Sequence, residues 1–357
     1  MRAARITADE LAARAPGDLL GGVLLAPVRL PARTLPKGSR LDQASAAALV
    51  AAAQAGTLGR PLRLAWPDPD DLHEDDAAER LALAVGGAGV DLRGPRQSRL
   101  DLVAKWPGVL HIRTDALRAL NAIDLLEVFT LFDGQAVLQD QVVCSVKVAP
   151  HLLPSAVVNQ GVRVARESAP LVEVRPYRRL AVGAIAAEAL APEALARFEA
   201  GARTKVEALG STFTGTIVVP DDDPERAAAG ARAALASLVL TRRLPVVLVG
   251  GVSAGDPLSP FYAALSELGG VIVRRGVPAH PGSMIWLARL GESQLLGLPQ
   301  CGMFTLATAA DLVLPRLLTG EALTAAALAE LALGGVLTRE MRFRFPAYAR
   351  DLQAPEG

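Results

Sequence analysis

The residues best suited to chemistry by type and spacing lie between positions 250 and 256, directly after an apolar run. Glycines at the carboxyl end of a strand let backbone N–H groups approach an anion, and a following helix directs its positive end toward it. The segment therefore predicts a small-molecule pocket, while a tight turn that needs glycine at positive φ is the alternative use of the same residues. The residues concerned are Gly250, Gly251, Ser253, Gly255 and Asp256.

An alternation of strand and helix patterns places this segment in a sheet. Apolar runs typical of strands stand at 180–185, 214–219 and 246–249. Helical patterns separate them at 192–209 and 224–240. This βαβαβ order predicts an α/β fold with a doubly wound, mostly parallel sheet that carries helices on both faces. Further strands are expected at 271–273, 284–290 and 295–298, followed by one long helix at 303–318.

Proline spacing predicts where this domain begins. Pro150, Pro154, Pro170 and Pro176 mark a connector. We expect three regions: a mixed α/β N-terminal domain with its connector at 1–170, the sheet domain at 171–320 and a C-terminal extension at 321–357. In the N-terminal domain, strands are expected at 23–30, 63–66 and 141–148, and helices at 43–54, 73–86, 115–121 and 155–167.

The C-terminal extension carries one strand-like pattern. Met341, Phe343 and Phe345 alternate with two arginines. Alternation of apolar and polar residues is typical of a strand with one buried face, so a half-buried strand is expected there.

Composition limits the classes of partner. The chain has 357 residues, of which 51% are hydrophobic and 21% charged, with 37 basic residues against 37 acidic ones. This balance gives no broad positive field, so neither a nucleic acid nor a membrane surface is expected as a partner. Charges through the first 20 residues interrupt any apolar core of a secretory signal, and Cys144 and Cys301 form no disulfide or metal spacing. A cytoplasmic location is therefore expected.

An ordered set of glycine-containing segments resembles a known family. Residues 250–256 are followed by Leu268-Gly269-Gly270, by residues 276–283 (GVPAHPGS) and by Leu296-Gly297-Leu298-Pro299. This set is similar to the molybdopterin-binding domain of molybdenum-cofactor biosynthesis proteins, over roughly residues 177–318. Segments in the N-terminal region, including Leu35-Pro36-Lys37-Gly38, resemble the front part of bifunctional molybdopterin-binding/cytidylyltransferase proteins.

The resemblance implies a ligand, molybdopterin or the molybdenum cofactor, and roles for particular residues. Its phosphate suits Gly250, Gly251 and Ser253, and its pterin edge carries N–H groups that Asp256 can accept. A magnesium contact is a second role for Asp256, and capping the next helix is the structural alternative. The segment Pro281, Gly282 and Ser283 suits a second wall, or a simple turn between strands.

Departures from the family pattern favour binding over catalysis. The family's Thr-Gly-x-Glu turn after the first strand keeps only its glutamate here, Glu188. Leu258 stands where catalytic relatives carry a second aspartate, and leucine can neither hold magnesium nor accept a proton. Gln300-Cys301 replaces an asparagine-containing turn, and Cys301 itself suits either the core or the ligand site.

Three hypotheses follow, and whether the chain is an enzyme is left open. The first is a carrier or maturation factor that binds the pterin for a client molybdoenzyme. The second is an enzyme of the same fold that inserts molybdate or transfers a nucleotide. The third is a non-catalytic scaffold, for which alanine-rich helices at 227–238 and 325–333 would support self-association as a homo-oligomer.

Other conspicuous residues are assigned no catalytic role. The acidic run Asp221, Asp222 and Asp223 precedes Pro224 and is expected to cap a helix. The four histidines show no spacing typical of metal ligands, so no zinc site is expected.

Overall fold

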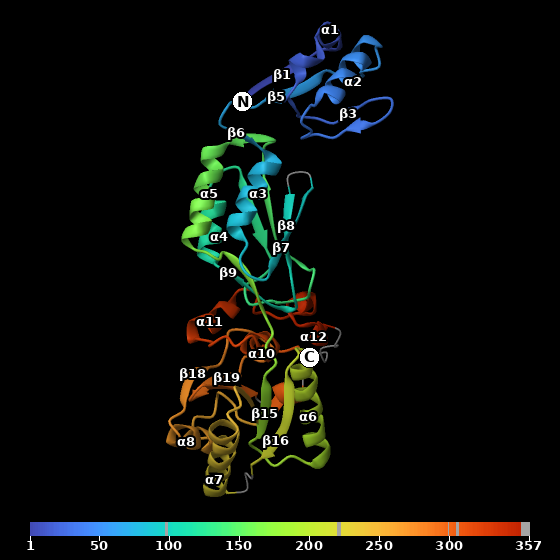
Figure 1. Ribbon diagram of the computed structural model, residues 1–357. Coiled ribbons are helices and arrows are strands. Elements are labelled where there is room, and N and C mark those ends of the chain that lie inside the picture. The colour runs from blue at the N-terminus through green and yellow to red at the C-terminus, as the bar shows by residue number, and fades with distance from the viewer. Residues whose placement is uncertain (97–98, 220–222, 299, 305–306, 351–357) are drawn as a thin grey trace. The chain divides into compact units, whose positions relative to one another are not determined.

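The computed structural model describes residues 1–96, 99–219, 223–298, 300–304 and 307–350 (Figure 1). The chain divides into two compact units. Unit 1 comprises residues 1–105, 111–133 and 139–174, and unit 2 comprises residues 106–110, 134–138 and 175–357. Both units contain helices and sheets, which confirms the α/β class.

Unit 1 begins with a small antiparallel sheet in the order β1-β5-β2, formed by β1 (Arg2–Ile6), β5 (Leu62–Trp66) and β2 (Val23–Leu24). The helices α1 (Ala8–Ala12) and α2 (Gln43–Gln54) share a core with it that includes Ile6, Leu49 and Leu64. The strand expected at 23–30 is in fact two: β2, and β3 (Val28–Arg29), which pairs with β4 (Thr34–Leu35). A short 3-10 helix lies at Pro16–Leu19.

The rest of unit 1 contains a four-stranded antiparallel sheet in the order β10-β12-β8-β7. Its strands are β10 (Leu126–Thr130), β12 (Val142–Val148), β8 (Arg99–Ala104) and β7 (Val90–Arg96). The helices are α3 (Glu74–Val85), α4 (Thr114–Asn121) and α5 (Ser155–Glu167). The short strands β6 (Asp71–His73) and β13 (Leu152–Pro154) pair with each other. Three further short strands form a sheet in the order β11-β9-β14. By the division above, β11 (Ala136–Val137) belongs to unit 2, and β9 (Gly108–Ile112) and β14 (Val172–Pro176) have residues in both units.

Unit 2 is built on a six-stranded sheet in the order β16-β15-β17-β20-β19-β18. The strands are β15 (Ala181–Ala186), β16 (Thr212–Val218), β17 (Val246–Gly250), β18 (Val271–Arg275), β19 (Trp286–Leu290) and β20 (Ser293–Leu298). The first four strands in this order are parallel, whereas β19 is antiparallel to both of its neighbours. The sheet is therefore mixed, with five of the strands running in one direction.

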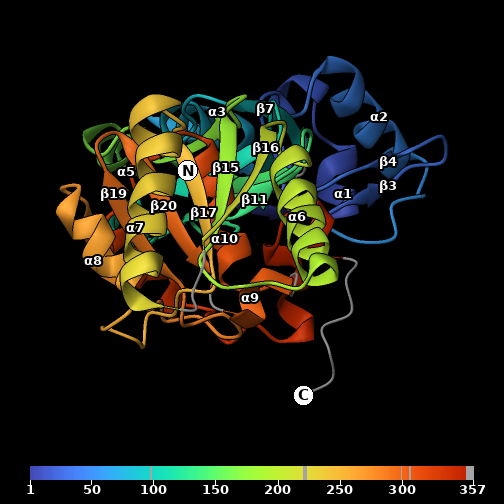
Figure 2. The ribbon, with the colours of Figure 1, turned by 90° about the horizontal axis from the view of Figure 1, so that it is seen from below.

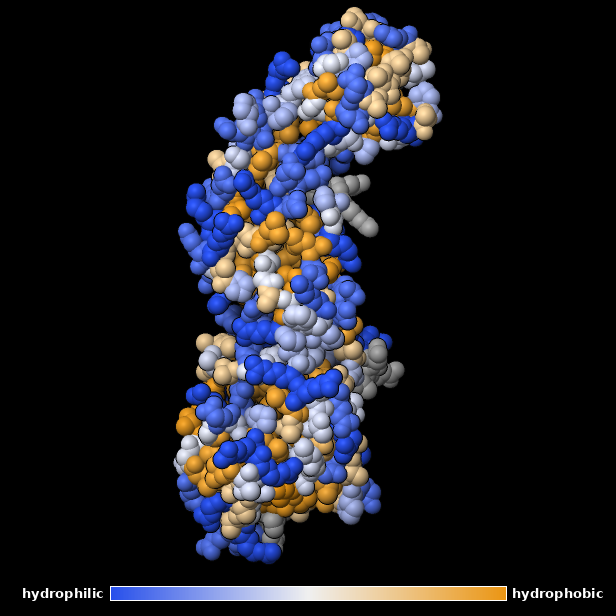
Figure 3. All heavy atoms as spheres, viewed as in Figure 1, coloured by the Kyte–Doolittle hydropathy of each residue, from blue (hydrophilic) through white to orange (hydrophobic). Residues whose placement is uncertain are grey.

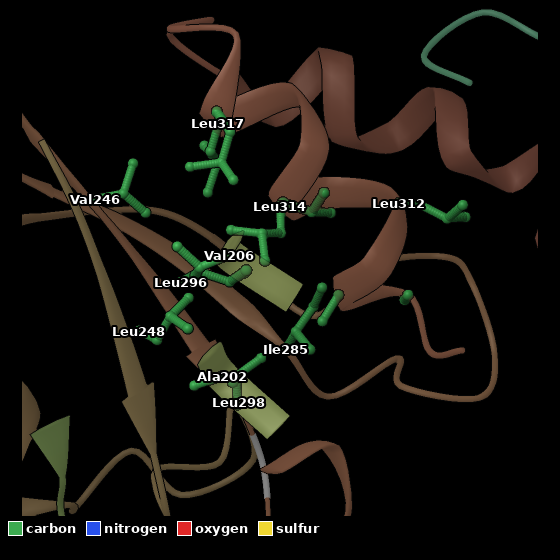
Figure 4. Packing of buried hydrophobic residues seen from close by; sticks show 14 of the residues in the cluster. Ala202, Val206, Val246, Leu248, Ile285, Leu296, Leu298, Leu312, Leu314 and Leu317 are labelled. Carbon is green, nitrogen blue, oxygen red and sulfur yellow. The ribbon is translucent and has the colours of Figure 1, made fainter. Parts of the chain in front are cut away.

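Residues of β17 alternate between two cores. Val246 and Leu248 belong to the first core, with Ala202 and Val206 of α6 (Pro192–Glu207) (Figure 4). Val247 and Val249 belong to the second core, together with α7 (Pro224–Leu235), its π-helical continuation Ala236–Thr241 and α8 (Pro260–Glu267). A strand buried on both faces is continuously apolar, which explains the run at this position. Figure 2 shows the sheet between α6 on one side and α7 and α8 on the other.

The expectation of one long helix near the end of the chain was wrong. The single helix expected at 303–318 is replaced by α9 (Gln300–Phe304) and α10 (Ala310–Leu318). Ala307 adopts a φ of +66°, in the left-handed region, and an α-helix cannot pass through that conformation.

The strand expected around Met341 to Phe345 is a 3-10 helix at Arg339–Arg344. The phenylalanines do not share a buried face, because Phe345 is buried in the first core and Phe343 is 44% exposed. The guanidinium of Arg344 is buried and donates to the carbonyls of Leu333 and Gly334. The side chains thus satisfy tertiary contacts that override the alternating pattern.

The C-terminal elements belong to the core of unit 2. They are α11 (Ala325–Ala329), a 3-10 helix at Glu330–Ala332, the 3-10 helix at Arg339–Arg344 and α12 (Ala347–Arg350). Leu328, Leu331 and Phe345 are buried in the first core with the sheet. On the viewed face, hydrophobic residues are interspersed with hydrophilic ones (Figure 3). Among the described residues, none of the helices has the length and apolar character needed to span a membrane.

Candidate functional site

Strand direction brings the predicted site residues to one edge of the six-stranded sheet. Gly250 is the last residue of β17, and Glu188 follows the end of the adjacent strand β15. The strand β18 runs in the same direction, so the loop 276–285 that leaves it starts at the same edge. In open α/β sheets, ligands bind outside the carboxyl ends of strands.

Close packing explains the two consecutive glycines. A Cβ at Gly250 would lie 2.6 Å from Cε of Met303, inside the first core. Gly251 has a φ of +86°, and a Cβ there would lie 2.9 Å from Cγ of Glu188. A side chain at Gly250 would displace the end of the Met303 side chain, and one at Gly251 would displace Glu188 and also strain the backbone. Glu188 packs directly on the glycine loop, defined here as residues 250–256.

Hydrogen bonds hold the glycine loop in one conformation. The amide of Gly251 donates to the carbonyl of Leu298 at 3.2 Å, and the amide of Gly255 donates to Oγ of Ser253 at 3.2 Å. The amide of Asp256 donates to the carbonyl of Ser253 at 3.3 Å. These amides are engaged within the protein. Because the Ser253 hydroxyl accepts a bond from Gly255, its own proton can be donated to a ligand.

The second predicted wall touches the glycine loop. The amide of Ala254 donates to the carbonyl of Met284 at 3.3 Å, and a Cβ at Gly255 would lie 2.8 Å from Cε of Met284. Gly282 has a φ of +97° and packs against Thr308 and Ala309. Pro281, Gly282 and Ser283 therefore lie in a loop that contacts the glycine loop one residue further along, at Met284.

Asp256 does not cap the helix that follows it. The N-cap of α8 is Ser259, three residues later. Asp256 is exposed, and its Oδ1 accepts the amide of Leu258 at 3.0 Å. This local bond fixes the direction of the carboxylate before the helix begins. No partner for Oδ2 is found among the described residues, so this oxygen can accept an N–H group from a ligand.

Two further residues at this edge were missed by the sequence analysis. The hydroxyl of Tyr262 donates to the carbonyl of Ser253 at 3.1 Å. Cζ of Arg275, the last residue of β18, lies 4.7 Å from the centre of the Tyr262 ring. Burial raises the pKa of Tyr262, the charge of Arg275 opposes that rise and the charge of Asp256 adds to it. A cation from β18 and a carboxylate from the glycine loop thus both influence Tyr262.

The signal for Arg275 in the sequence is its place directly before Gly276-Val277-Pro278. A basic pair such as Arg274-Arg275 is more often solvated, so the pattern alone does not indicate a ligand contact. The two arginines in fact differ. Arg274 donates to the carbonyls of Gly276 and Ala325, whereas Arg275 is exposed beside Tyr262.

A buried ion pair orders the residues against which the loop with Gly282 packs. Nζ of Lys205 lies 2.5 Å from Oδ1 of Asp311, and both side chains are almost wholly buried. Oδ2 of Asp311 accepts the amide of Thr308 at 2.9 Å. Because Gly282 packs on Thr308 and Ala309, Asp311 fixes the surface on which that loop rests.

The remaining candidates from the sequence lie elsewhere or have other roles. Asp223 caps α7, as expected, by accepting the amides of Glu225 and Arg226. Asp221 and Asp222 lie outside the described residues, as does the side chain of Cys301. Burial raises the pKa of the Cys144 thiol to about 12, so it is protonated and unreactive at neutral pH. In the described part of the chain, no three His, Cys, Asp or Glu residues are grouped as metal ligands.

Comparison with known proteins finds similarity only at the level of solved structures. No family model and no curated protein matches the chain. The molybdopterin biosynthesis enzyme MoaB of Thermus thermophilus is similar with a TM-score of 0.28 and 19% identity, covering 40% of this chain and 98% of that one. The molybdopterin biosynthesis protein MoeA of Pyrococcus horikoshii has a TM-score of 0.27 and 14% identity, covering 72% and 80%.

A third similar structure, a deletion mutant of NadC, has a TM-score of 0.16 and 14% identity, covering 54% of this chain and 78% of that one. Scores this low carry no argument about function. The proposal below therefore depends on the geometry of the sheet edge.

Proposed function

We propose that unit 2 binds a phosphorylated pterin, molybdopterin or the molybdenum cofactor, at the edge formed by the glycine loop. In this proposal the chain acts as a carrier or maturation factor for a client molybdoenzyme. The observation that carries the proposal is that a cation, Arg275, and a carboxylate, Asp256, both act on Tyr262, whose hydroxyl is bonded to the carbonyl of Ser253.

The donor set fits both ends of such a ligand. Arg275 and the Ser253 hydroxyl are donors suited to a phosphate, because guanidinium groups recognise phosphate oxygens through charge-assisted hydrogen bonds. Asp256 is an acceptor suited to the N–H groups of a pterin edge. Gly251 leaves room for Glu188 to pack against the loop.

The same residues favour binding over group transfer. Leu258 is 88% exposed beside Asp256, where a second carboxylate would be needed to share a magnesium ion. An exposed leucine at this place suits contact with the apolar face of a ring or with a partner protein.

Anaerobic isothermal titration of the protein with molybdopterin tests the proposal. We expect saturable binding that Asp256→Ala weakens about tenfold or more, since a lost hydrogen bond to a charged group is worth roughly 1.5–3 kcal/mol. Asp124→Ala is a matched control, because Asp124 is also exposed and its Oδ1 also accepts a nearby amide, that of Leu125. Absence of saturable heat, or equal affinity in the Asp256 variant, would refute the site.

A further inference from the structure

Unit 1 contains a groove, whereas the proposed pterin site lies in unit 2. Its volume is about 940 Å³, and it is lined by residues from 26–34, which include β3, and from 57–63, which lead into β5. The walls combine apolar and basic side chains. Among them are Val28, Leu30, Pro61, Arg29, Arg60 and Arg63.

The charge of this groove is of one sign. None of the described residues that line it is acidic. Arg29, Arg60 and Arg63 are exposed, and within the described residues none of them forms a salt bridge. Other arginines of unit 1 do have carboxylate partners: Arg40 pairs with Asp76, Arg99 with Asp101 and Arg118 with Asp115.

The sheet beside the groove places two like charges together. Arg5 of β1 is directly opposite Arg63 of β5. Like charges in opposite positions of an antiparallel pair destabilise the sheet. The alternate residues Ile6, Leu62 and Leu64 face the core with α1 and α2, so the two arginines share the opposite face. An anionic partner would relieve this repulsion.

We infer that this groove binds an acidic, extended peptide segment of a partner protein. Clusters of arginine recognise acidic motifs, and apolar walls contact the side chains between the acidic residues. The groove is open, and its volume is near the upper end for sites that enclose small molecules, which favours an extended chain. A nucleic acid suits the chain less well, since its net charge is zero.

A displayed library of random peptides, panned against the full-length protein, tests the inference. We expect the recovered peptides to be enriched in Asp and Glu, and the best of them, synthesised with a fluorescent label, to bind more weakly as salt rises. The double variant Arg29→Glu/Arg63→Glu should weaken peptide binding at least about tenfold. It removes two guanidinium donors and replaces them with carboxylates that repel an acidic peptide.

The matched control is Arg163→Glu/Arg166→Glu, on α5. It changes the net charge equally but lies outside the groove. Circular dichroism establishes that both variants are folded. Recovery of no peptide, recovery without acidic enrichment or equal weakening by the control would overturn the inference. Tighter binding of a nucleoside triphosphate or an oligonucleotide in the same groove, displacing the peptide, would overturn it as well.

Discussion

At the scale of single residues, Lys205 and Asp311 form an ion pair inside unit 2 whose side chains are almost wholly buried. Tyr348 adds a hydrogen bond to Oδ1 of Asp311 at 2.9 Å, and Thr308 binds Oδ2. A buried charge is costly unless it is paired and hydrogen-bonded, so each partner depends on the others.

We predict that Asp311→Ala lowers the free energy of unfolding by about 3–5 kcal/mol, because it leaves the Lys205 ammonium buried without its carboxylate. Urea unfolding followed by circular dichroism measures the change. The double variant Lys205→Met/Asp311→Leu removes both charges and should recover the part of the loss that comes from the unpaired ammonium, but not the part that comes from the hydrogen bonds of Thr308 and Tyr348. If the double variant were no more stable than the single one, the cost would not come from the unpaired charge.

We predict that Gly251→Ala weakens pterin binding and destabilises the protein by about 1–3 kcal/mol, because its φ of +86° strains any other residue. The added methyl group would also displace Glu188. Titration calorimetry and urea unfolding measure the two effects. Gly210→Ala is the comparison, since Gly210 has a similar φ of +79° with no atom near its missing side chain. If the two variants bound the pterin with equal affinity, displacement of Glu188 would not be the cause of weaker binding.

At the scale of elements, α12 is attached to the core through buried phenols. Burial raises the pKa values of Tyr177 and Tyr348, and the charge of Asp311 adds to the shift of Tyr348. A raised pKa means that the unfolded chain releases these protons first as the pH rises. This contribution to stability is therefore complete below about pH 10 and is lost as the pH rises above that value.

We predict that the urea midpoint of unit 2 falls as the pH rises above about 10. Tyr177→Phe should make this fall shallower, because phenylalanine has no proton to release. Tyr348→Phe should do the same and also lower stability at neutral pH by about 1 kcal/mol, through loss of the bond to Asp311. An equally steep fall in both variants would contradict this origin of the alkaline sensitivity.

The elements that the sequence predicted are those that carry local signals. Gln43–Gln54 and Ser155–Glu167 have the predicted bounds, and the first follows a strong cap, since Asp42 accepts the amide of Ser45. The order of strands and helices from β15 to β17 was also predictable from periodicity. The 3-10 helix at Arg339–Arg344 was not, because its conformation depends on distant carbonyls that receive Arg344.

Part of the candidate site was predictable from local sequence signals, and part of it was not. The glycine loop was apparent from its strand-loop-helix pattern, whereas the roles assigned to its residues stay predictions. Arg275 and Tyr262 come together because the order β20-β19-β18 returns the chain to the same edge. No local pattern contains that order, so the pair could not be found from the sequence.

At the scale of the whole molecule, the two units have separate cores. The core around Leu49 and Leu64 belongs to unit 1, and the first and second cores belong to unit 2. Chains with several cores commonly depart from two-state unfolding.

We predict two unfolding transitions in differential scanning calorimetry, one for each unit. Molybdopterin should raise the Tm of the unit 2 transition and leave the other Tm unchanged. At a ligand concentration 100 times Kd, the stabilisation should be about 2.7 kcal/mol. Asp311→Ala should lower the Tm of the same transition. Because Asp311 lies in unit 2, this shift would identify the transition as that of unit 2. A shift of the other transition by the ligand would place the binding site outside the glycine loop.

The indole of Trp286 can serve as a fluorescent probe of the glycine loop. Its N–H donates to the carbonyl of Val252 at 2.9 Å, and its ring lies 5.4 Å from that of Tyr262. The chain has three tryptophans, so replacing Trp66 and Trp106 with phenylalanine leaves one emitter bonded to the loop. The emission of that single indole would then report, in real time and without a label, when the loop opens or receives a guest.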